Sequence, residues 1–170
     1  RQRQMCIRDR SCATHGKRSI VATHLLESMI NNPTPTRAEV TDIANAVYEG
    51  ADAVMLSGET SIGNYPEECL GFMKSIVAET EKFKTLGYEN NLQKNSDWEH
   101  IGQAAKDLAE SIEAEGIIAV TRTGATATYI ANAKPHGVPI FSFTNNEVTL
   151  RQLSLVAVSY THLTLPTIRM

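Results

Sequence analysis

Residues 20–56, IVATHLLESMINNPTPTRAEVTDIANAVYEGADAVML, contain two short apolar runs on either side of a helical pattern. The runs are residues 20–23 (IVAT) and 53–56 (AVML), and neither has the polar alternation of a half-exposed strand. Such runs are typical of parallel strands that are covered on both faces. Two buried strands with a helix between them predict an α/β fold.

The helix between the runs has clear start and stop signals. Thr36 and Glu39 have the spacing of a capping box, in which each side chain accepts a hydrogen bond from a free backbone N–H of the first turn. Gly50 predicts where this helix ends, because glycine is common just after the last turn of a helix. The apolar stripe of this helix follows at i, i+3, i+4 and i+7 and comprises Val40, Ile43, Ala44 and Val47.

Residues 57–63 (SGETSIG) are expected to form a polar loop, and Pro66 suits the first turn of the next helix. The expected stripe of that helix is Leu70, Met73, Ile76 and Val77. Residues 84–97 then have few apolar side chains, so we place a linker there.

The second half repeats the alternation of helices and strands. Ser96 and Glu99 form another capping-box pair. We expect strands at 117–120 and 139–143, a helix at 125–133, and a helix at 147–153 that is capped by Asn145. The first helix of this half has one apolar face made of Ile101, Ala104, Ala105, Leu108 and Ile112. These elements predict a small open α/β unit that stops one or two strands early.

The two ends differ from the rest of the chain. The peptides MCIRDR and SYTHLTLPTI resemble translated sequencing-adapter DNA, so we expect segments 1–10 and 158–170 to be non-native. The alternative is a disordered arm at 1–10 and an edge strand at 158–170. The predicted organisation is therefore a non-native segment at 1–10, a domain at 11–83, a linker at 84–97, a domain at 98–157, and a non-native tail at 158–170.

Bulk composition excludes several classes of partner. The net charge of −3 gives no reason to expect nucleic acid, and no apolar run is long enough to span a bilayer. Cys6, Cys12 and Cys69 have neither metal spacing nor an even count, which favours a reducing cytoplasm. No zinc pattern, P-loop or dinucleotide fingerprint occurs.

Polar side chains follow both expected strands of the first half. Thr23 and His24 end the first, and Ser57, Glu59 and their neighbours end the second. Parallel strands place their carboxyl ends at one edge, where ligand sites collect in α/β proteins. The alternative is structural: Thr23 caps a helix, Ser57 shapes a turn, and His24 is a satisfied structural histidine.

A second candidate site lies between a strand and a helix in the second half. Its residues are Thr121, Arg122, Thr123, Gly124 and Thr126. Hydroxyls, a guanidinium and the N–H groups of a helix start suit a phosphate group. The alternative is a capped turn with a solvated arginine.

Several motifs, in order, resemble one enzyme family. They are residues 20–29 (IVATHLLESM), 35–39 (PTRAE), 42–47 (DIANAV), and 55–60 (MLSGET) followed by Gly63 and 65–66 (YP). They are similar to pyruvate kinases over about residues 11–156. The resemblance implies an α/β fold made of the last two βα units of a (β/α)8 barrel and a partial, open α/β C-terminal regulatory domain.

The resemblance also implies an activity and residue roles. The family transfers the phosphoryl group of phosphoenolpyruvate to ADP, giving pyruvate and ATP, with Mg²⁺ and K⁺, in a cytoplasmic homotetramer. Thr23 would contact phosphoenolpyruvate and take part near the proton-delivery step. Ser57, and more loosely Glu59, would belong to the polar and water network at the same edge. Glu59, Ser61 and Ile62 would lie near the nucleotide, although Ile62 stands where many members have lysine or asparagine.

Further implied roles are regulatory and structural. The turn at 121–126 matches the effector-phosphate loop of the family, with Ala125 in place of a frequent arginine. Arg37 and Asp42 would lie near a subunit interface. The catalytic lysine and the ligands of both metal ions are absent from this chain, so we expect the chain alone to be inactive. The alternatives are a free-standing phosphate-binding regulatory module and a barrel fragment without a role.

Overall fold

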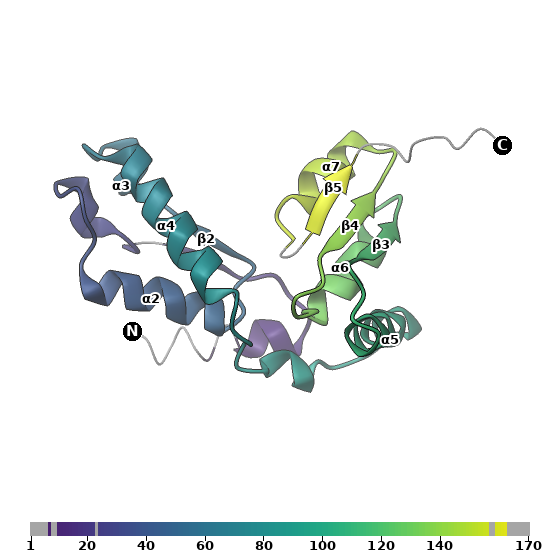
Figure 1. The fold of residues 1–170 in the computed structure, drawn as a ribbon. Helices are drawn as coiled ribbons and strands as arrows, with labels where there is room; N and C mark the ends of the chain where they lie inside the picture. The colour runs from purple at the N-terminus through teal and green to yellow at the C-terminus, as the bar shows by residue number, and fades with distance from the viewer. Residues whose placement is uncertain (1–6, 8–9, 23, 157–158, 163–170) are drawn as a thin grey trace. The chain divides into compact units, whose positions relative to one another are not determined.

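The computed structural model describes residues 7, 10–22, 24–156 and 159–162 (Figure 1). The chain divides into two compact units. The first comprises Arg1–Arg10 and Ser19–Tyr88, and the second comprises Ser11–Arg18 and Glu89–Met170. Each unit has its own hydrophobic core. None of the helices in the described ranges combines the length and the apolar character of a membrane-spanning segment.

The first unit contains a two-stranded parallel sheet and the helices that connect and follow its strands. Its elements are β1 (Ile20–Ala22), the 3-10 helix η1 (Glu27–Ile30), α2 (Arg37–Tyr48), β2 (Ala53–Met55), α3 (Gly58–Ser61) and α4 (Pro66–Thr80). Val21 pairs with Val54 in the middle of the parallel ladder. The predicted strand–helix–strand order is confirmed, and residues 57–63, expected to be loop, include the short helix α3.

The predicted capping box starts α2. Thr36 Oγ1 accepts the backbone N–H of Glu39, and the Glu39 carboxylate accepts the backbone N–H of Thr36. Gly50 follows the end of the helix with φ of +81°, which a residue with a side chain rarely adopts. Local signals therefore define this helix at both ends.

The core of the first unit gathers around η1. Leu26, Met29 and Ile43 are fully buried there, and Val21 is 5% exposed. Ile20 and Met55, by contrast, are 53% and 45% exposed. The unit therefore buries one side of its small sheet with its own helices and leaves the other side uncovered.

In α4 the buried positions differ from the predicted stripe. Pro66 occupies the first turn as expected, and Met73 is buried. Leu70, however, is 62% exposed, whereas its neighbour Cys69 is fully buried. The inclusion of Leu70 in the stripe was wrong, because Cys69 and not Leu70 belongs to the buried core of the unit.

The second unit is a three-stranded parallel sheet with helices between its strands. Its elements are η2 (Tyr88–Asn91), which begins at the unit boundary, α5 (Asp97–Ser111), β3 (Ile117–Val120), α6 (Ala125–Asn132), β4 (Ile140–Phe143), α7 (Glu147–Leu153) and β5 (Ser159–His162). The strand order is β3–β4–β5. The expected elements are present, and β5 adds an edge strand that pairs with β4.

Two expectations for the second unit were wrong. The cap of α7 is Asn146, not Asn145, because the Asn146 Oδ1 accepts the backbone N–H of Thr149 at 3.0 Å. The apolar face of α5 is also mostly exposed, with Leu108 at 62% and Ile112 at 64%. The face that packs on α6 has small residues such as Gly102, which allow the two backbones to approach closely.

Candidate functional site

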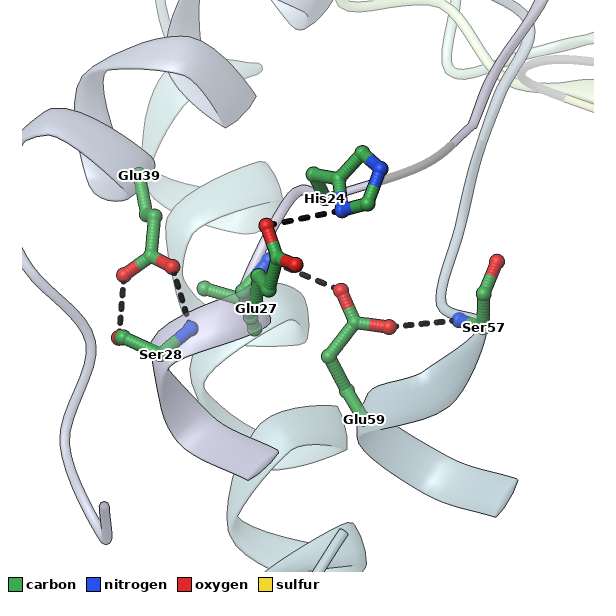
Figure 2. Close-up of polar contacts among 7 residues, drawn as sticks. His24, Glu27, Ser28, Glu39, Ser57 and Glu59 are labelled. Carbon is green, nitrogen blue, oxygen red and sulfur yellow. Dashed lines mark hydrogen bonds and ion pairs between the residues drawn. The ribbon is translucent and has the colours of Figure 1, made fainter. Parts of the chain in front are cut away.

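The first candidate site is the edge where β1 and β2 end. The parallel register, with Ala22 opposite Met55, puts both carboxyl ends at the same edge. Thr23, the predicted substrate-binding and catalytic threonine, lies outside the described residues. Its neighbours His24 and Leu26, and Ser57 and Glu59 after β2, define the edge (Figure 2).

Ser57 lies between β2 and α3 and is half-buried. Its backbone N–H donates to Glu59 Oε2 at 2.8 Å, and its carbonyl oxygen accepts from the N–H of Ser61 at 3.2 Å. The side chain of Ser57 points away from Glu59 (Figure 2). The backbone N–H and carbonyl groups of Ser57 are therefore bonded within its own loop, and its hydroxyl is not directed at Glu59.

Glu59 is the residue whose environment differs most from expectation. The surrounding loop looked too polar to be core, yet Glu59 is only 2% exposed. Its Oε1 accepts the backbone N–H of Leu26 at 3.1 Å, in addition to the bond from Ser57. Burial by itself would raise the pKa of this carboxyl, but the backbone N–H donors of Glu59, Ser57 and Leu26, with the charge of His24, hold the pKa below its ordinary value.

The turn after β1 has an unusual backbone and several polar contacts. His24 has φ of +56°, which is uncommon for a residue with a side chain. Its Nδ1 lies 2.8 Å from Glu27 Oε2, and both side chains are more than half exposed. The turn therefore depends on neighbouring groups rather than on a glycine for its conformation.

A second carboxylate holds the same turn from the side of α2. Glu39 accepts the backbone N–H of Ser28 at 2.7 Å and its hydroxyl at 2.6 Å (Figure 2). It also accepts two bonds from Thr36. Burial opposes the charged form, but these four donors keep the pKa of the Glu39 carboxyl below its ordinary value. One carboxylate thus both caps α2 and anchors η1.

Close packing at α3 explains a glycine of the same loop. A Cβ at Gly63 would lie 2.3 Å from the carbonyl oxygen of Glu59, so no larger residue fits without movement of the backbone.

Burial, followed by the negative charges of Glu59 and Glu68, raises the pKa of the Cys69 thiol beneath this turn. The outer residues of the loop are accessible: Ser61 is exposed, and Ile62 is 76% exposed.

The second candidate site is a cavity of about 360 Å³ within the second unit. Three of its lining residues, Thr123, Gly124 and Ala125, come from the predicted phosphate-binding turn. The others come from residues 15–17 and from the sides of α5 and α6: His15, Gly16, Lys17, Glu99, Thr128, Tyr129 and Asn132. The cavity thus combines a helix start with one lysine, one histidine, several hydroxyl groups and the carboxylate of Glu99.

Not all residues of the predicted turn face this cavity. Thr121 is buried, and its Oγ1 accepts the backbone N–H of Gly124 at 2.9 Å, so that its hydroxyl shapes the turn. Arg122 is exposed, and its carbonyl oxygen accepts the hydroxyl of Thr149. Arg122 and Thr126 are not among the lining residues. Gly124, with φ of +86°, allows the chain to enter α6.

The contribution of residues 15–17 to the cavity was not predicted. Arg18 Nη2 donates to Thr128 Oγ1 at 3.1 Å, and Asn132 Nδ2 donates to the carbonyl oxygen of Gly16 at 3.0 Å. These contacts join residues more than a hundred positions apart in the sequence. No local pattern in the sequence could have indicated that Lys17 lies beside the start of α6.

The two predicted interface residues lie in the first half of α2. Arg37 is exposed at the start of the helix, and Asp42 is half-buried. Their role in an interface remains a prediction.

The described residues include no cluster of metal-binding side chains. Residues 7, 10–22, 24–156 and 159–162 contain no group of three or more His, Cys, Asp or Glu side chains that could hold a metal ion. At the strand edge both oxygens of Glu59 accept backbone N–H groups, and Glu27 contacts His24. The described residues therefore do not fit a Mg²⁺ site.

Comparison with known proteins gives one family for both units. The family profile described as pyruvate kinase, barrel domain, matches residues 1–70, and the profile described as pyruvate kinase, alpha/beta domain, matches residues 99–165. The pyruvate kinase of Chlamydia muridarum is 43% identical over 147 residues, covering 82% of this chain and 30% of that protein. The pyruvate kinase of Staphylococcus haemolyticus is 42% identical over 155 residues, covering 89% of this chain and 26% of that protein.

A solved structure agrees with the sequence comparison. The crystal structure of a pyruvate kinase from Cryptosporidium parvum is similar with a TM-score of 0.88 and 33% identity, covering 97% of this chain and 34% of that chain. The chain therefore spans about a third or less of the length of these relatives. With two matching profiles, relatives at more than 40% identity and a similar solved structure, the chain belongs to the pyruvate kinase family.

Proposed function

We propose that this chain is part of an enzyme that transfers the phosphoryl group of phosphoenolpyruvate to ADP in the cytoplasm. In this proposal β1 and β2 are the last two strands of a (β/α)8 barrel, and their carboxyl ends form one edge of the active site. The observation that carries the proposal is the placement of Ser57 and Glu59 directly after β2, at the edge where β1 ends. Both family profiles, one for each part of the chain, support it.

The proposed roles of the residues at this edge are those that the family resemblance implies. Thr23 contacts phosphoenolpyruvate and lies near the step that delivers a proton to the enolate carbon of the leaving pyruvate. Ser57 joins the polar network there, and its hydroxyl, which points away from Glu59, supports that role. Ser61 and Ile62, both exposed, border the nucleotide.

The remaining groups needed for phosphoryl transfer belong to the rest of the parent enzyme. Such reactions depend on neutralising the charge of the phosphate oxygens, mostly by metal ions and cationic side chains. The proposal includes Mg²⁺ and K⁺ in the parent enzyme, but the described residues offer no metal site. We therefore derive no step through a metal for this chain and propose that the chain alone is inactive.

The experiment compares the chain with a full-length parent enzyme that contains it. Pyruvate formation from phosphoenolpyruvate and ADP is measured for both at equal molar concentration, with Mg²⁺ and K⁺ present. The parent is expected to form pyruvate and the 170-residue chain to remain at background. Turnover by the chain alone would refute its inactivity, and a parent without turnover would refute the proposed reaction.

A second function is favoured by the cavity of the second unit. Its polar lining and its place at the start of α6 suit the phosphate of an effector, in a parent enzyme or in a regulatory module without catalysis. Thr123 and Gly124 would contact the phosphate, and Lys17 would supply positive charge. Thr121 would shape the turn, with Arg122 and Thr126 at its border.

Phosphate binding can be measured on the 170-residue chain by NMR titration with inorganic phosphate and a sugar phosphate. Shifts of the Gly124 and Ala125 amides are expected, and Lys17→Ala should weaken them. Lys94→Ala, an exposed lysine of the same unit, serves as the matched control. Equal affinities in all three proteins would contradict the role of Lys17.

The proposed parent is a homotetramer in which Arg37 and Asp42 form charged contacts between subunits. The exposure of Arg37 is compatible with this role. Arg37→Ala in the full-length parent should raise the dissociation constant of the tetramer, measured by analytical ultracentrifugation. An unchanged constant would remove Arg37 from the interface.

A further inference from the structure

The Glu59 carboxylate is the one side chain in Figure 2 that joins the segments after β1 and after β2. Its Oε1 accepts the N–H of Leu26 and its Oε2 accepts the N–H of Ser57. Leu26 follows Thr23 by three residues, and Ser57 is itself assigned to the active-site edge. We propose that Glu59 is a positioning residue of the reaction, which sets the distance between the turn after β1, held at Leu26, and Ser57.

This inference rests on the proposed function and gives Glu59 a different role from a nucleotide contact. The side chain is 2% exposed, whereas Ile62 in the same loop is 76% exposed. Both carboxylate oxygens already accept backbone N–H groups at normal hydrogen-bond distances. Glu59 therefore acts on a substrate through the two loops that it joins and not by direct contact.

The charge of Glu59 is what makes the link strong. Hydrogen bonds to an ionised acceptor are stronger than those between neutral groups, and burial strengthens them further. The N–H donors keep the carboxyl ionised despite its burial, since they lower its pKa. A glutamine of the same size could accept only one of the two N–H groups and would direct its own NH2 group against the other.

The backbone of His24 shows that the turn needs such restraint. A positive φ at a residue with a side chain costs free energy and persists where surrounding contacts determine it. Glu59 restrains the turn at Leu26, Glu39 restrains it at Ser28, and Glu27 contacts the His24 ring. Of these three glutamates, Glu59 alone also contacts the segment after β2. Its loss should therefore displace the turn after β1 relative to Ser57.

The kinetic test uses the full-length parent enzyme with Glu59→Gln. A displacement of about 1 Å in a catalytic group can cost 100-fold in rate, so we expect kcat per folded molecule to fall about 10- to 100-fold. Glu59→Asp, which keeps the charge on a shorter side chain, should retain more activity than Glu59→Gln. Glu79→Gln is the matched control, because Glu79 is an exposed glutamate of α4 in an ion pair with Lys82, and its kcat should equal that of the unmodified parent.

The folded fraction of each variant, measured by circular dichroism, separates positioning from a structural role. A merely structural role lowers the amount of folded enzyme and leaves kcat per folded molecule unchanged, and that result would overturn the inference. A parent that is inactive before mutation would refute the proposed function instead.

A second measurement on the 170-residue chain does not depend on activity. The amide protons of Leu26 and Ser57 should titrate together in NMR spectra as Glu59 is protonated, and Glu59→Gln should abolish the shared transition. Independent titration of the two amides would overturn the link whatever the kinetics show.

Discussion

Replacement of Gly102 by alanine should destabilise the second unit, although the same change inside a helix usually stabilises. Glycine in a helix interior costs about 0.5–1 kcal/mol relative to alanine. Gly102 lies in α5, and a Cβ there would be 2.7 Å from the carbonyl oxygen of Tyr129 and 2.8 Å from its carbonyl carbon. Both atoms belong to the backbone of α6, so no side-chain rotation can relieve the contact.

The magnitude follows from the displacement that the new methyl group demands. Ordinary van der Waals contact starts at 3.4 Å, so α5 and α6 must separate by 0.7 Å (3.4 minus 2.7). Overpacking of this kind costs about 1–3 kcal/mol, and contact with backbone favours the upper half of that range. After subtraction of the helix-propensity gain, Gly102→Ala should lower the free energy of unfolding by about 1–2 kcal/mol.

Gly71 in α4 provides the matched control. A Cβ at Gly71 would have no atom within 4 Å, so the propensity gain should appear in full and stabilise the first unit by about 0.5–1 kcal/mol. Urea denaturation followed by hydrogen exchange of single amides measures the stability of α4 and of α5 separately. The fluorescence of Trp98, the single tryptophan, also reports on α5. If both substitutions changed stability in the same direction, the close contact between α5 and α6 would be refuted.

Three further predictions concern the edge after β1. The pKa of both Glu39 and Glu59 is lowered from 4.5, so each stabilises the fold above that pH, and the stabilisation is lost as pH falls through the folded-state pKa. The urea midpoint should therefore fall more steeply below pH 4.5 in the unmodified chain than in the double glutamine variant; parallel curves would contradict this. His24→Gly should raise the free energy of unfolding by about 1 kcal/mol, because relief of the positive φ exceeds the loss of an exposed ion pair; a thermal melt that shows destabilisation would argue against strain. Met29→Ala should cost about 2–5 kcal/mol, since Met29 is fully buried, whereas Ile62→Ala should change stability by less than about 0.5 kcal/mol; denaturation midpoints that do not differ would be inconsistent with the described core.

The elements with local signals could be predicted from the sequence. Both capping boxes, at Thr36 with Glu39 and at Ser96 with Glu99, are present because each depends on residues three positions apart. The cap of α7 was misplaced by one residue for a related reason. Asn145 and Asn146 have the same side chain, and only the approach of the chain to α7 decides which of them accepts the N–H of Thr149.

The faces of the helices were harder to predict. Periodicity shows that α5 has an apolar stripe, but it does not show which face another helix covers. In α5 the contact with α6 uses Gly102, whose small size permits close approach, while Leu108 remains exposed. Close packing of backbones is a tertiary property, and hydrophobicity along the sequence does not record it.

The candidate site likewise has features that the sequence predicts and features that only the tertiary structure shows. That the turn after β1 and Ser57 lie at one edge followed from the order of parallel strands alone. The burial of Glu59 did not follow, because its partner Leu26 lies 33 residues away and offers only a backbone N–H, which every residue except proline carries. Likewise, the contact of Glu39 with Ser28 adds a tertiary role to a residue that local spacing marks as a cap.

The packing of η1 explains why this edge keeps its geometry within so short a chain. Leu26 donates its N–H to Glu59, and Met29 follows Ser28, which donates to Glu39. The side chains of Leu26 and Met29 are fully buried in one core with residues of α2 and α4. Ile20 and Met55, which in the proposed barrel would face its missing part, are about half exposed and contribute little to that core. The position of the turn after β1 therefore depends on contacts that this chain supplies itself. In the proposed function, the binding of substrate depends on the rest of the parent enzyme, so the geometry of the edge can be tested in this chain and its chemistry only in the parent enzyme.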